Sequence, residues 1–297
     1  MNITKLARNP RAMKAMTGVS YKEFTDLAPI FERAERVHRE NKPNRMRKAG
    51  GGRKGHLKTV EEKLFYILFY IKTYPTFDIM AFFFGKGRGR SCETAHLYLE
   101  LLEKALGEKI VLPACRIGSI EEFIRLFPEV RDVFPDGTER RMQRPKNAKQ
   151  NKRHYSGKKK AHTRKNIVMA DGNKRILLVS PTKPGRRHDK RLSDRISLIE
   201  HIPKDVGIWT DSGFQGIERH HPNVAVAKRG CKNRTLTGEE KQENRNISSL
   251  RVGVEHAIGG MKRFRACYDV LRNRIGRFDD RVVVVAAGLW NYHLQHG

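Results

Sequence analysis

The sequence has few acidic residues for its length and few cysteines. Its 297 residues include 32 Asp and Glu against 61 Lys and Arg, which gives a formal net charge of +29. A field of this size attracts polyanions, and we therefore expect nucleic acid as the partner. The four cysteines lie at positions 92, 115, 231 and 267 and form no Cys-x-x-Cys pair. This spacing indicates neither a disulfide framework nor a zinc ribbon, and it is typical of a protein in a reducing compartment.

Long apolar runs and a secretory signal are also lacking. Residues 1–18 carry scattered charges, and the longest apolar stretches, 64–71 and 282–290, fall well short of the ~20 residues that a membrane helix needs. We expect no membrane partner, and a cytoplasmic, nucleoid-associated protein. Apolar residues still make up 38% of the chain and include 14 Phe, which is enough for a buried core in one large domain or two ordinary ones.

A capping box predicts the first long helix. Ser20 and Glu23 have the spacing in which each side chain caps the other's backbone, and apolar residues follow at helical intervals over 20–39. Residues 44–55 combine Arg and Lys with three consecutive glycines, a composition too charged and too flexible to pack. We interpret 1–55 as an N-terminal helix and a basic Gly/Arg linker, which either grips DNA or is a solvated tether.

Three short helices are predicted over 56–112. They are expected at 64–71 behind a second capping box of Thr59 and Glu62, at 77–84, and from about Ser91 onward. This succession predicts a helix-turn-helix-like DNA-binding domain, whose third helix would present Arg88, Arg90 and Thr94 to the major groove. The glycine-rich corner at 85–89 is longer and looser than a tight helix-turn-helix corner, so a plain helical bundle stays open as an alternative.

The pattern changes at Pro113 to a mixed order of strands and helices. The expected elements are a helix at 119–127, a strand at 133–143, strands at 166–170 and 174–180 joined by the hairpin signal Asp171-Gly172, a helix at 189–201, strands at 206–210 and 224–227, and a helix at 238–264. We predict an α/β fold for 113–297, a ribonuclease H-like mixed sheet flanked by helices, preceded by the small all-α helix-turn-helix-like domain. The tail at 282–292 is ambiguous, because its valines favour a strand and its alanines and length favour a helix.

Three acidic residues stand out in this basic chain. Asp136 follows a β-run in Phe-Pro-Asp-Gly-Thr, Asp211 closes Gly-Ile-Trp-Thr-Asp, and Glu255 lies inside the long helix. Carboxylates that project from strand ends suit Mg²⁺ or Mn²⁺, and two such ions support phosphodiester chemistry. Asp132 and Glu139 compete with Asp136 for the first position, and we choose Asp136 because the β-run ends there.

Two cations share a helix face with Glu255. Arg251, Glu255 and Lys262 map to roughly 0°, 40° and 20° around a helix of about 100° per residue. Glu255 can then ligate metal while Arg251 and Lys262 hold DNA phosphates on either side. The alternative is a solvated charged face with ordinary Arg–Glu pairing.

A basic run follows the first predicted strand of this region. Residues 140–165 hold 12 Lys and Arg and no acid. We expect this run to line the entry to the acidic site, with Lys158, Lys159 and Lys160 on DNA phosphates and Tyr155 stacked on an unpaired base. The alternative is a solvated loop.

His188 and Asp189 precede the next predicted helix. Asp189 is most simply an acid at a helix N-terminus, which the helix dipole favours. A role for His188 and Asp189 beside the metal ligands stays open.

Five ordered motifs carry a family resemblance. Arg251-x3-Glu255-x6-Lys262 matches part of a transposase signature Tyr-x2-Arg-x3-Glu-x6-Lys, with Ser248 in the position of the Tyr. The other motifs are Phe134-Pro-Asp-Gly-Thr-Glu-Arg-Arg, Tyr155-Ser-Gly-Lys-Lys-Lys, Gly185-Arg-Arg-His-Asp-Lys and Thr210-Asp-Ser-Gly-Phe-Gln-Gly. In this order they resemble the DDE transposases of the insertion-sequence-5 family.

The resemblance implies a ribonuclease H-like core in which Asp136, Asp211 and Glu255 are the catalytic residues and the ligands of two Mg²⁺ or Mn²⁺ ions. It implies a DNA transposase that cuts at the ends of an insertion sequence and joins them to target DNA. The expected partners are double-stranded DNA, both terminal inverted repeats and target, and further copies of the chain, as a homo-oligomer on DNA. Two alternatives stay open: a catalytically silent DNA-binding regulator derived from a transposase, and a nuclease or resolvase that cleaves without joining.

Overall fold

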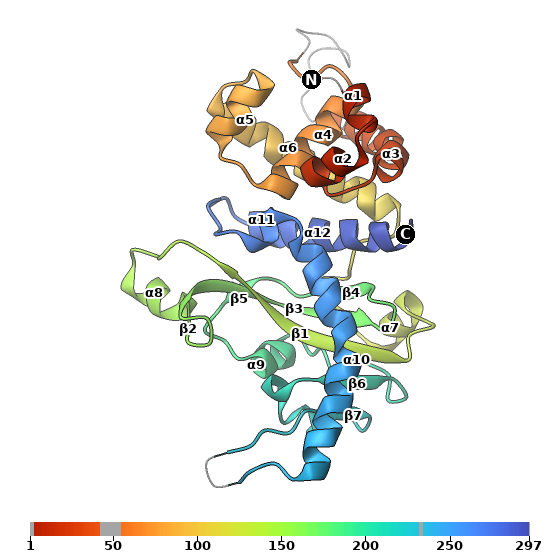
Figure 1. Cartoon of the computed structure of the whole chain (residues 1–297), viewed down its shortest axis with the longest axis vertical. Coiled ribbons are helices and arrows are strands. Elements are labelled where there is room, and N and C mark those ends of the chain that lie inside the picture. The colour runs from red at the N-terminus through yellow and green to blue at the C-terminus, as the bar shows by residue number, and fades with distance from the viewer. Residues whose placement is uncertain (1–2, 42–54, 232–233, 297) are drawn as a thin grey trace. The chain divides into compact units, whose positions relative to one another are not determined.

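The computed structural model describes residues 3–41, 55–231 and 234–296 and divides the chain into two compact units (Figure 1). The first unit contains residues 1–112, 261–269 and 273–297, and the second contains 113–260 and 270–272. The predicted linker at 44–55 lies, except for its last residue, outside the described residues. Among the residues that the structure does describe, no helix is both long enough and apolar enough to cross a membrane.

The first unit is built from helices drawn from both ends of the chain. They are α1 (Ile3–Ala7), α2 (Pro10–Thr17), α3 (Tyr21–Glu40), α4 (Val60–Thr73), α5 (Phe77–Phe84), α6 (Arg88–Glu108), α11 (Arg265–Tyr268) and α12 (Phe278–Leu294). The two predicted capping boxes are confirmed, Ser20 with Glu23 on α3 and Thr59 with Glu62 on α4. Helix α4 is buried almost all round, as its continuous apolar run requires.

The ambiguous tail is the helix α12, and it packs within the first unit. Val282, Val285 and Leu289 are buried, and the Arg281 Nε donates to Glu103 of α6 at 2.6 Å. Sequence patterns assigned all of 113–297 to one domain, but an apolar helix of this length needs a second helical surface to cover it. The helices of the N-terminal part provide that surface.

Helices α5 and α6 meet at a short corner. Helix α6 begins at Arg88, three residues earlier than expected, so the corner is only 85–87. Gly85 has φ of 61°, a left-handed conformation that glycine adopts without steric cost, and it ends α5. The expectation of a long, loose corner was therefore wrong. A DNA-binding role for α4, α5 and α6 stays a prediction.

The second unit is a mixed sheet with helices. Its strands are β1 (Asp132–Arg141), β2 (Tyr155–Ser156), β3 (Ala161–Asp171), β4 (Ile176–Val179), β5 (Lys183–Pro184), β6 (Gly207–Thr210) and β7 (Val224–Val226), and its helices are α7 (Ile120–Leu126), α8 (Ala148–His154), α9 (Asp189–Arg195) and most of α10 (Gly238–Lys262). Strands β2, β4 and β5 pair with β3, which pairs with β1 on its other side.

The strand directions confirm the predicted ribonuclease H-like sheet. Its central order is β4-β3-β1-β6-β7, in which β4 and β1 are both antiparallel to β3, and β6 and β7 are parallel to β1. The predicted hairpin between β3 and β4 is also confirmed, because the Asp171 Oδ1 accepts hydrogen bonds from the backbone N–H of Asn173 and of Arg175, each at 2.9 Å. Buried apolar residues of the sheet, such as Ile167 and Ile208, form its core.

Candidate active site

Asp136 and Asp211 lie where β1 and β6 separate. The two strands are parallel, with Asp132 opposite Gly207 and Val133 opposite Ile208, and the same offset carries Asp136 level with Asp211. Asp211 directly follows β6, as predicted. Asp136 lies inside β1, as the predicted strand at 133–143 requires, and the choice of Asp136 as the point where the β-run ends was wrong. The strand continues because β3 pairs with it well beyond the point where β6 stops.

Backbone N–H groups orient both carboxylates. The Asp211 Oδ1 caps the following turn and accepts from the Gly213 N–H at 2.9 Å. The Asp136 Oδ1 accepts from the Gly137 N–H at 2.8 Å. Two carboxylates from strands far apart in sequence therefore lie close together, Asp211 oriented by the turn that it caps and Asp136 by the next N–H of its own strand.

Asp189, at the start of α9, is a third member of the cluster. A Cβ on Gly137 would lie 2.3 Å from the Asp189 Oδ1, and a Cβ on Gly213 would lie 2.9 Å from the Asp211 Oδ1 and 3.4 Å from the Asp189 Oδ2. Glycine is therefore required at 137 and 213 for Asp189 to approach the other two acids. The structure thus places Asp189 beside Asp136 and Asp211, and its role beside metal ligands stays a prediction.

The negative charge of the three aspartates is only partly neutralised by neighbouring cations. Burial raises the pKa of Asp136 above its ordinary value, the guanidinium of Arg251 opposes that rise, and the neighbouring carboxylates of Asp211 and Asp189 add to it. The Asp189 Oδ1 is buried and accepts no hydrogen bond in the described structure. Oxygen donors gathered with an excess of negative charge fit a divalent cation such as Mg²⁺ or Mn²⁺.

Lys165 forms ion pairs with Asp189 of the cluster and with Glu139. Sequence reasoning did not identify this role. Its Nζ lies 3.1 Å from the Glu139 Oε1 and 3.1 Å from the Asp189 Oδ1, and it donates to the Arg187 carbonyl at 3.0 Å. The side chains of Lys165, Glu139 and Asp189 are 7%, 4% and 13% exposed. Glu139 and Lys165 stand directly opposite each other in the antiparallel pair of β1 and β3, and no signal near either residue in the sequence reveals this register.

The two rival candidates for the first acid are both engaged elsewhere. Glu139 accepts from the Thr163 hydroxyl at 2.6 Å, and although burial acts to raise its pKa, the hydrogen bonds and charge of Thr163 and Lys165 hold it below the ordinary value. The Asp132 Oδ1 accepts from the Trp209 indole N–H at 2.6 Å. These contacts explain both acids as structural and leave Asp136 as the acid that faces Asp211.

Helix α10 brings Arg251 to the cluster. Its Nη2 lies 3.6 Å from the Asp136 Oδ1, and the residue is buried. Glu255, one turn later, is exposed, and the described residues contain no group of three His, Cys, Asp or Glu side chains arranged to hold a metal ion. Lys262 is the last residue of α10 and belongs to the first unit. The structure thus joins Arg251 to the aspartates and leaves Glu255 as a predicted third ligand.

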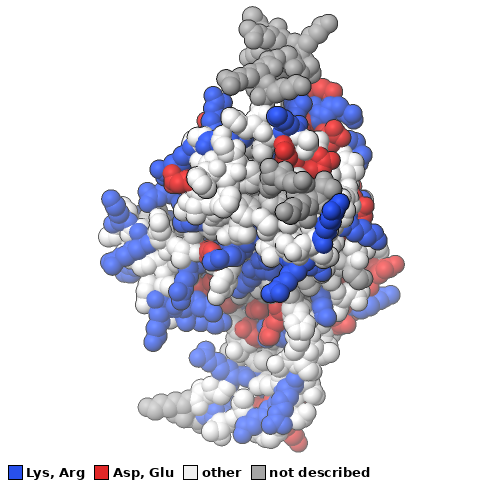
Figure 2. Space-filling model, turned by 45° about the horizontal axis from the view of Figure 1, so that its top comes forward, with Lys and Arg blue, Asp and Glu red and all other residues white. Residues whose placement is uncertain are grey.

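The other predicted DNA contacts are exposed at the surface. Lys158, Lys159 and Lys160 lie in the turn between β2 and β3, and they and Tyr155 of β2 are all exposed. His188 is exposed immediately before α9. Lys and Arg side chains cover much of the molecular face in Figure 2, with acidic side chains in small groups between them.

The predicted recognition residues on α6 are placed in its first two turns. Arg88 and Arg90 are exposed, and the Arg88 Nε lies 3.7 Å from the Asp78 Oδ1. The Thr94 hydroxyl accepts a hydrogen bond from the Lys86 Nζ at 2.9 Å. A nucleic-acid contact by these residues stays a prediction.

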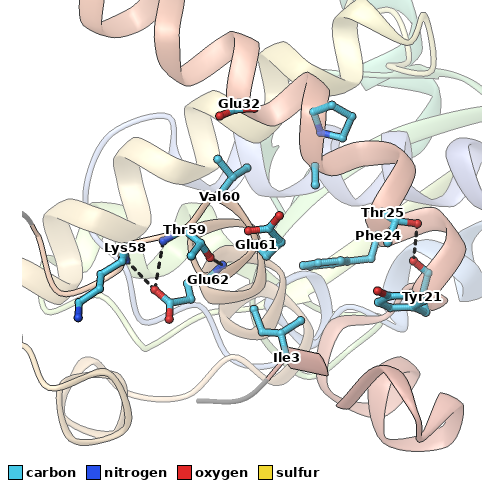
Figure 3. Close-up of a pocket in the computed structure, with 12 residues that line it drawn as sticks. Ile3, Tyr21, Phe24, Thr25, Glu32, Lys58, Thr59, Val60, Glu61 and Glu62 are labelled. Atoms are coloured by element: carbon cyan, nitrogen blue, oxygen red, sulfur yellow. Dashed lines mark hydrogen bonds between the residues drawn. The ribbon is translucent and has the colours of Figure 1, made fainter. Parts of the chain in front are cut away.

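A large pocket in the first unit has a different character. Its volume is about 1010 Å³, and Glu32, Glu61 and Glu62 line it together with apolar side chains (Figure 3). Glu62 accepts hydrogen bonds from the backbone N–H groups of Lys58 and Thr59 as part of the cap of α4. A pocket with three glutamates repels phosphates, so it is not a candidate for binding DNA.

Comparison with known proteins points to the chemistry of the acidic cluster. The DDE superfamily endonuclease family matches residues 135–291, more than half of the chain. A probable transposase for insertion sequence element IS702 from Microchaete diplosiphon is 28% identical over 287 residues, which cover 96% of this chain and 95% of that protein. A transposase for insertion sequence element IS1106 from Neisseria meningitidis serogroup B is 29% identical over 72 residues, 22% of this chain and 25% of that protein.

No solved structure matches the chain. The family match begins one residue before Asp136 and extends past Asp211 and Glu255, so all three predicted acids lie inside it. Membership of the insertion-sequence-5 family stays a prediction. The match over more than half of the chain, together with the ribonuclease H-like sheet, shows that this chain belongs to the DDE superfamily of endonucleases.

Proposed function

We propose that this protein is a DNA transposase that cleaves at the ends of an insertion sequence and transfers the strands to target DNA. The observation that carries the proposal is the cluster of Asp136 and Asp211 at one sheet edge, within a chain that aligns over nearly its full length with a probable transposase. Its DNA partners would be the terminal repeats and the target, and two DNA ends require more than one copy of the chain.

Asp136, Asp211 and Glu255 are the proposed ligands of two Mg²⁺ or Mn²⁺ ions. When bound, such ions supply an activated oxygen nucleophile and stabilise the leaving oxygen of the phosphodiester. Asp136 and Asp211 are the carboxylates already gathered and underneutralised, and Glu255 lies one helical turn from Arg251, which contacts Asp136. Glu255 would complete the ligand set on the same side of α10.

The surrounding residues hold this set and the DNA. Lys165 pairs with Glu139 and holds Asp189 within the cluster, and Arg251 pairs with Asp136 in the protein without DNA. Because a guanidinium binds carboxylate and phosphate alike, Arg251 is suited to hold a DNA phosphate once Asp136 serves a cation. We propose the same phosphate-binding role for Lys262 and for the lysines at 158–160.

The alternative function is a catalytically silent DNA-binding regulator with the same fold. Such a protein needs no acidic cluster, and a partly buried, repulsive group of carboxylates costs stability that selection does not maintain without a use. The presence of Asp136, Asp189 and Asp211 together therefore favours the enzyme. A nuclease that cuts without joining is separated from a transposase only by its products.

The test is cleavage and joining on labelled DNA from both flanks of the gene, with Mg²⁺ or Mn²⁺. Wild type is compared with Asp211→Asn. The matched control is Asp205→Asn, because Asp205 is exposed and its carboxylate lies as far as 4.0 Å from the guanidinium of Arg131. We expect wild type and Asp205→Asn to cut and join, and Asp211→Asn to bind DNA without cutting. Binding without cutting by all three proteins in both metals would support the regulator.

A further inference from the structure

Two adjoining pockets lie beside the acidic cluster in the second unit. The smaller, of about 350 Å³, is lined by Arg153, Pro184, Arg186, Arg187, His188 and Arg191. The larger, of about 580 Å³, is lined by Arg144, Ala148, Asn151, Lys152, Tyr155 and Arg186. Arg186 belongs to both, and the residues that line either pocket include no Asp or Glu.

The smaller pocket gathers cations from two separate segments. Arg153 comes from α8, and the other arginines come from the segment 186–191 that leads into α9. Burial and the neighbouring charges of Arg195 and Arg153 lower the pKa of Arg187, as repulsion between like charges requires. The nearby carboxylate of Asp189 is held by Lys165, and that of Asp194 pairs with Lys190 at 2.8 Å.

A phosphate group is the ligand that relieves this repulsion. Guanidinium groups bind phosphate oxygens through paired N–H donors, and clustered arginines without carboxylates are the usual arrangement for that ligand. A volume of about 350 Å³ admits a phosphodiester group with its sugar but not a stacked base pair.

The larger pocket offers an aromatic surface instead. Tyr155 is 44% exposed, and His162 lies against it edge to face, with ring centroids 5.5 Å apart. The His162 Nε2 is hydrogen-bonded to the Asn151 Oδ1 at 2.8 Å, which fixes this support. An exposed aromatic face of this kind stacks on unpaired bases regardless of their sequence.

We propose that the two pockets together bind one unpaired nucleotide of a DNA strand. Its base stacks on Tyr155 in the larger pocket, its phosphate lies among the arginines of the smaller pocket, and Arg186 contacts both. The proposal rests on the proposed function, since it takes DNA as the partner and makes the nucleotide part of the strand that enters the active site.

The hydrogen-bond network links this nucleotide site to the acids. The Arg187 carbonyl accepts from the Lys165 Nζ, and the same Nζ contacts Asp189, which lies beside Asp136 and Asp211. A nucleotide held by Arg186 and Arg187 is therefore separated from the acidic cluster by one residue, Lys165, which contacts both. The pockets would hold a strand end or a displaced base while the neighbouring phosphodiester lies over the aspartates.

The test measures binding of two labelled duplexes of equal length by fluorescence anisotropy, one fully paired and one with a single unpaired nucleotide. All proteins carry Asp211→Asn and metal is omitted, so that no cleavage interferes. We expect tighter binding of the duplex with the unpaired nucleotide. Loss of one stacked base weakens binding by about 5- to 150-fold, so Tyr155→Ala should remove most of this preference and leave the paired duplex unchanged.

Three variants sharpen the result. Tyr155→Phe keeps the ring and should retain the preference, Arg186→Ala should reduce it, and Lys204→Ala, which removes one exposed charge elsewhere in this unit, should not. A 2-aminopurine at the unpaired position should be quenched by the starting protein and by Tyr155→Phe, but not by Tyr155→Ala.

The outcomes separate this inference from the proposed function. Equal binding of both duplexes by the starting protein, or an equal loss for both with Tyr155→Ala, overturns the nucleotide site while DNA binding itself stands. Absence of binding to either duplex overturns both proposals at once.

Discussion

The buried lysine beneath the acidic cluster is expected to dominate the stability of the second unit. Lys165→Met removes a cation that lies 3.1 Å from Glu139 and 3.1 Å from Asp189, and all three side chains are nearly inaccessible to solvent. Methionine keeps the length of the side chain and leaves two buried carboxylates without their partner. Breaking a buried ion pair in this way costs about 3–5 kcal/mol.

The expected loss is large enough to measure without ambiguity. In a unit of this size each 1 kcal/mol changes the melting temperature by about 2–4 °C, so Lys165→Met should lower it by about 6–20 °C. The triple variant Lys165→Met, Glu139→Gln, Asp189→Asn removes the charges together and should recover most of the loss, because neutral groups carry a smaller desolvation penalty. Lys158→Met, in an exposed turn close by, should change stability by no more than about 0.5 kcal/mol.

The two tryptophans allow each unit to be followed separately. Trp209 lies in β6 of the second unit and Trp290 lies in α12 of the first. In a Trp290→Phe background, urea unfolding monitored by fluorescence reports on the second unit alone. If Lys165→Met costs less than about 1 kcal/mol in this assay, or if the triple variant is no more stable than the single one, the account of a paired, buried lysine is wrong.

Three further outcomes are expected. Gly137→Ala places a Cβ 2.3 Å from the Asp189 carboxylate and should reduce strand cleavage strongly while DNA binding persists, as gel-shift and cleavage assays can show together. Burial acts to raise the pKa of Glu23, but hydrogen bonds, including one from His293 at 2.6 Å, lower it overall. The first unit should therefore lose stability as the pH falls below about 4.5. Glu23→Gln should flatten that loss in unfolding monitored by the fluorescence of Trp290. Thr59→Ala removes the cap of α4 and should cost about 1 kcal/mol in the same assay.

Local signals in the sequence were sufficient for several of the elements. Capping boxes located the starts of α3 and α4, and the Asp171-Gly172 signal located the β3–β4 hairpin, because in each case the responsible groups are within four residues of one another. The order of strands and helices then predicted the ribonuclease H-like sheet. Asp211 was placed correctly at the end of β6 for the same local reason.

Features that depend on distant pairing were not predictable. Asp136 was placed at a strand end because nothing near it in sequence reveals that β3 extends β1 beyond β6. Helix α12 was left ambiguous because its fate depends on a surface provided by the N-terminal helices. Lys165 was counted among the cations for DNA, although its charge is used inside the protein.

The excess of positive charge therefore divides into two groups with different consequences. Lys165 and Arg251 are buried and contact the acids of the cluster, so they determine whether the carboxylates can be gathered at all. Arg186 and the lysines at 158–160 are exposed, and we propose that their charge binds DNA. Substitution of Lys165 should change stability before it changes DNA binding, and substitutions in the second group should do the reverse. Composition alone cannot make this division, because it depends on the register between β1 and β3 and on the path of α10.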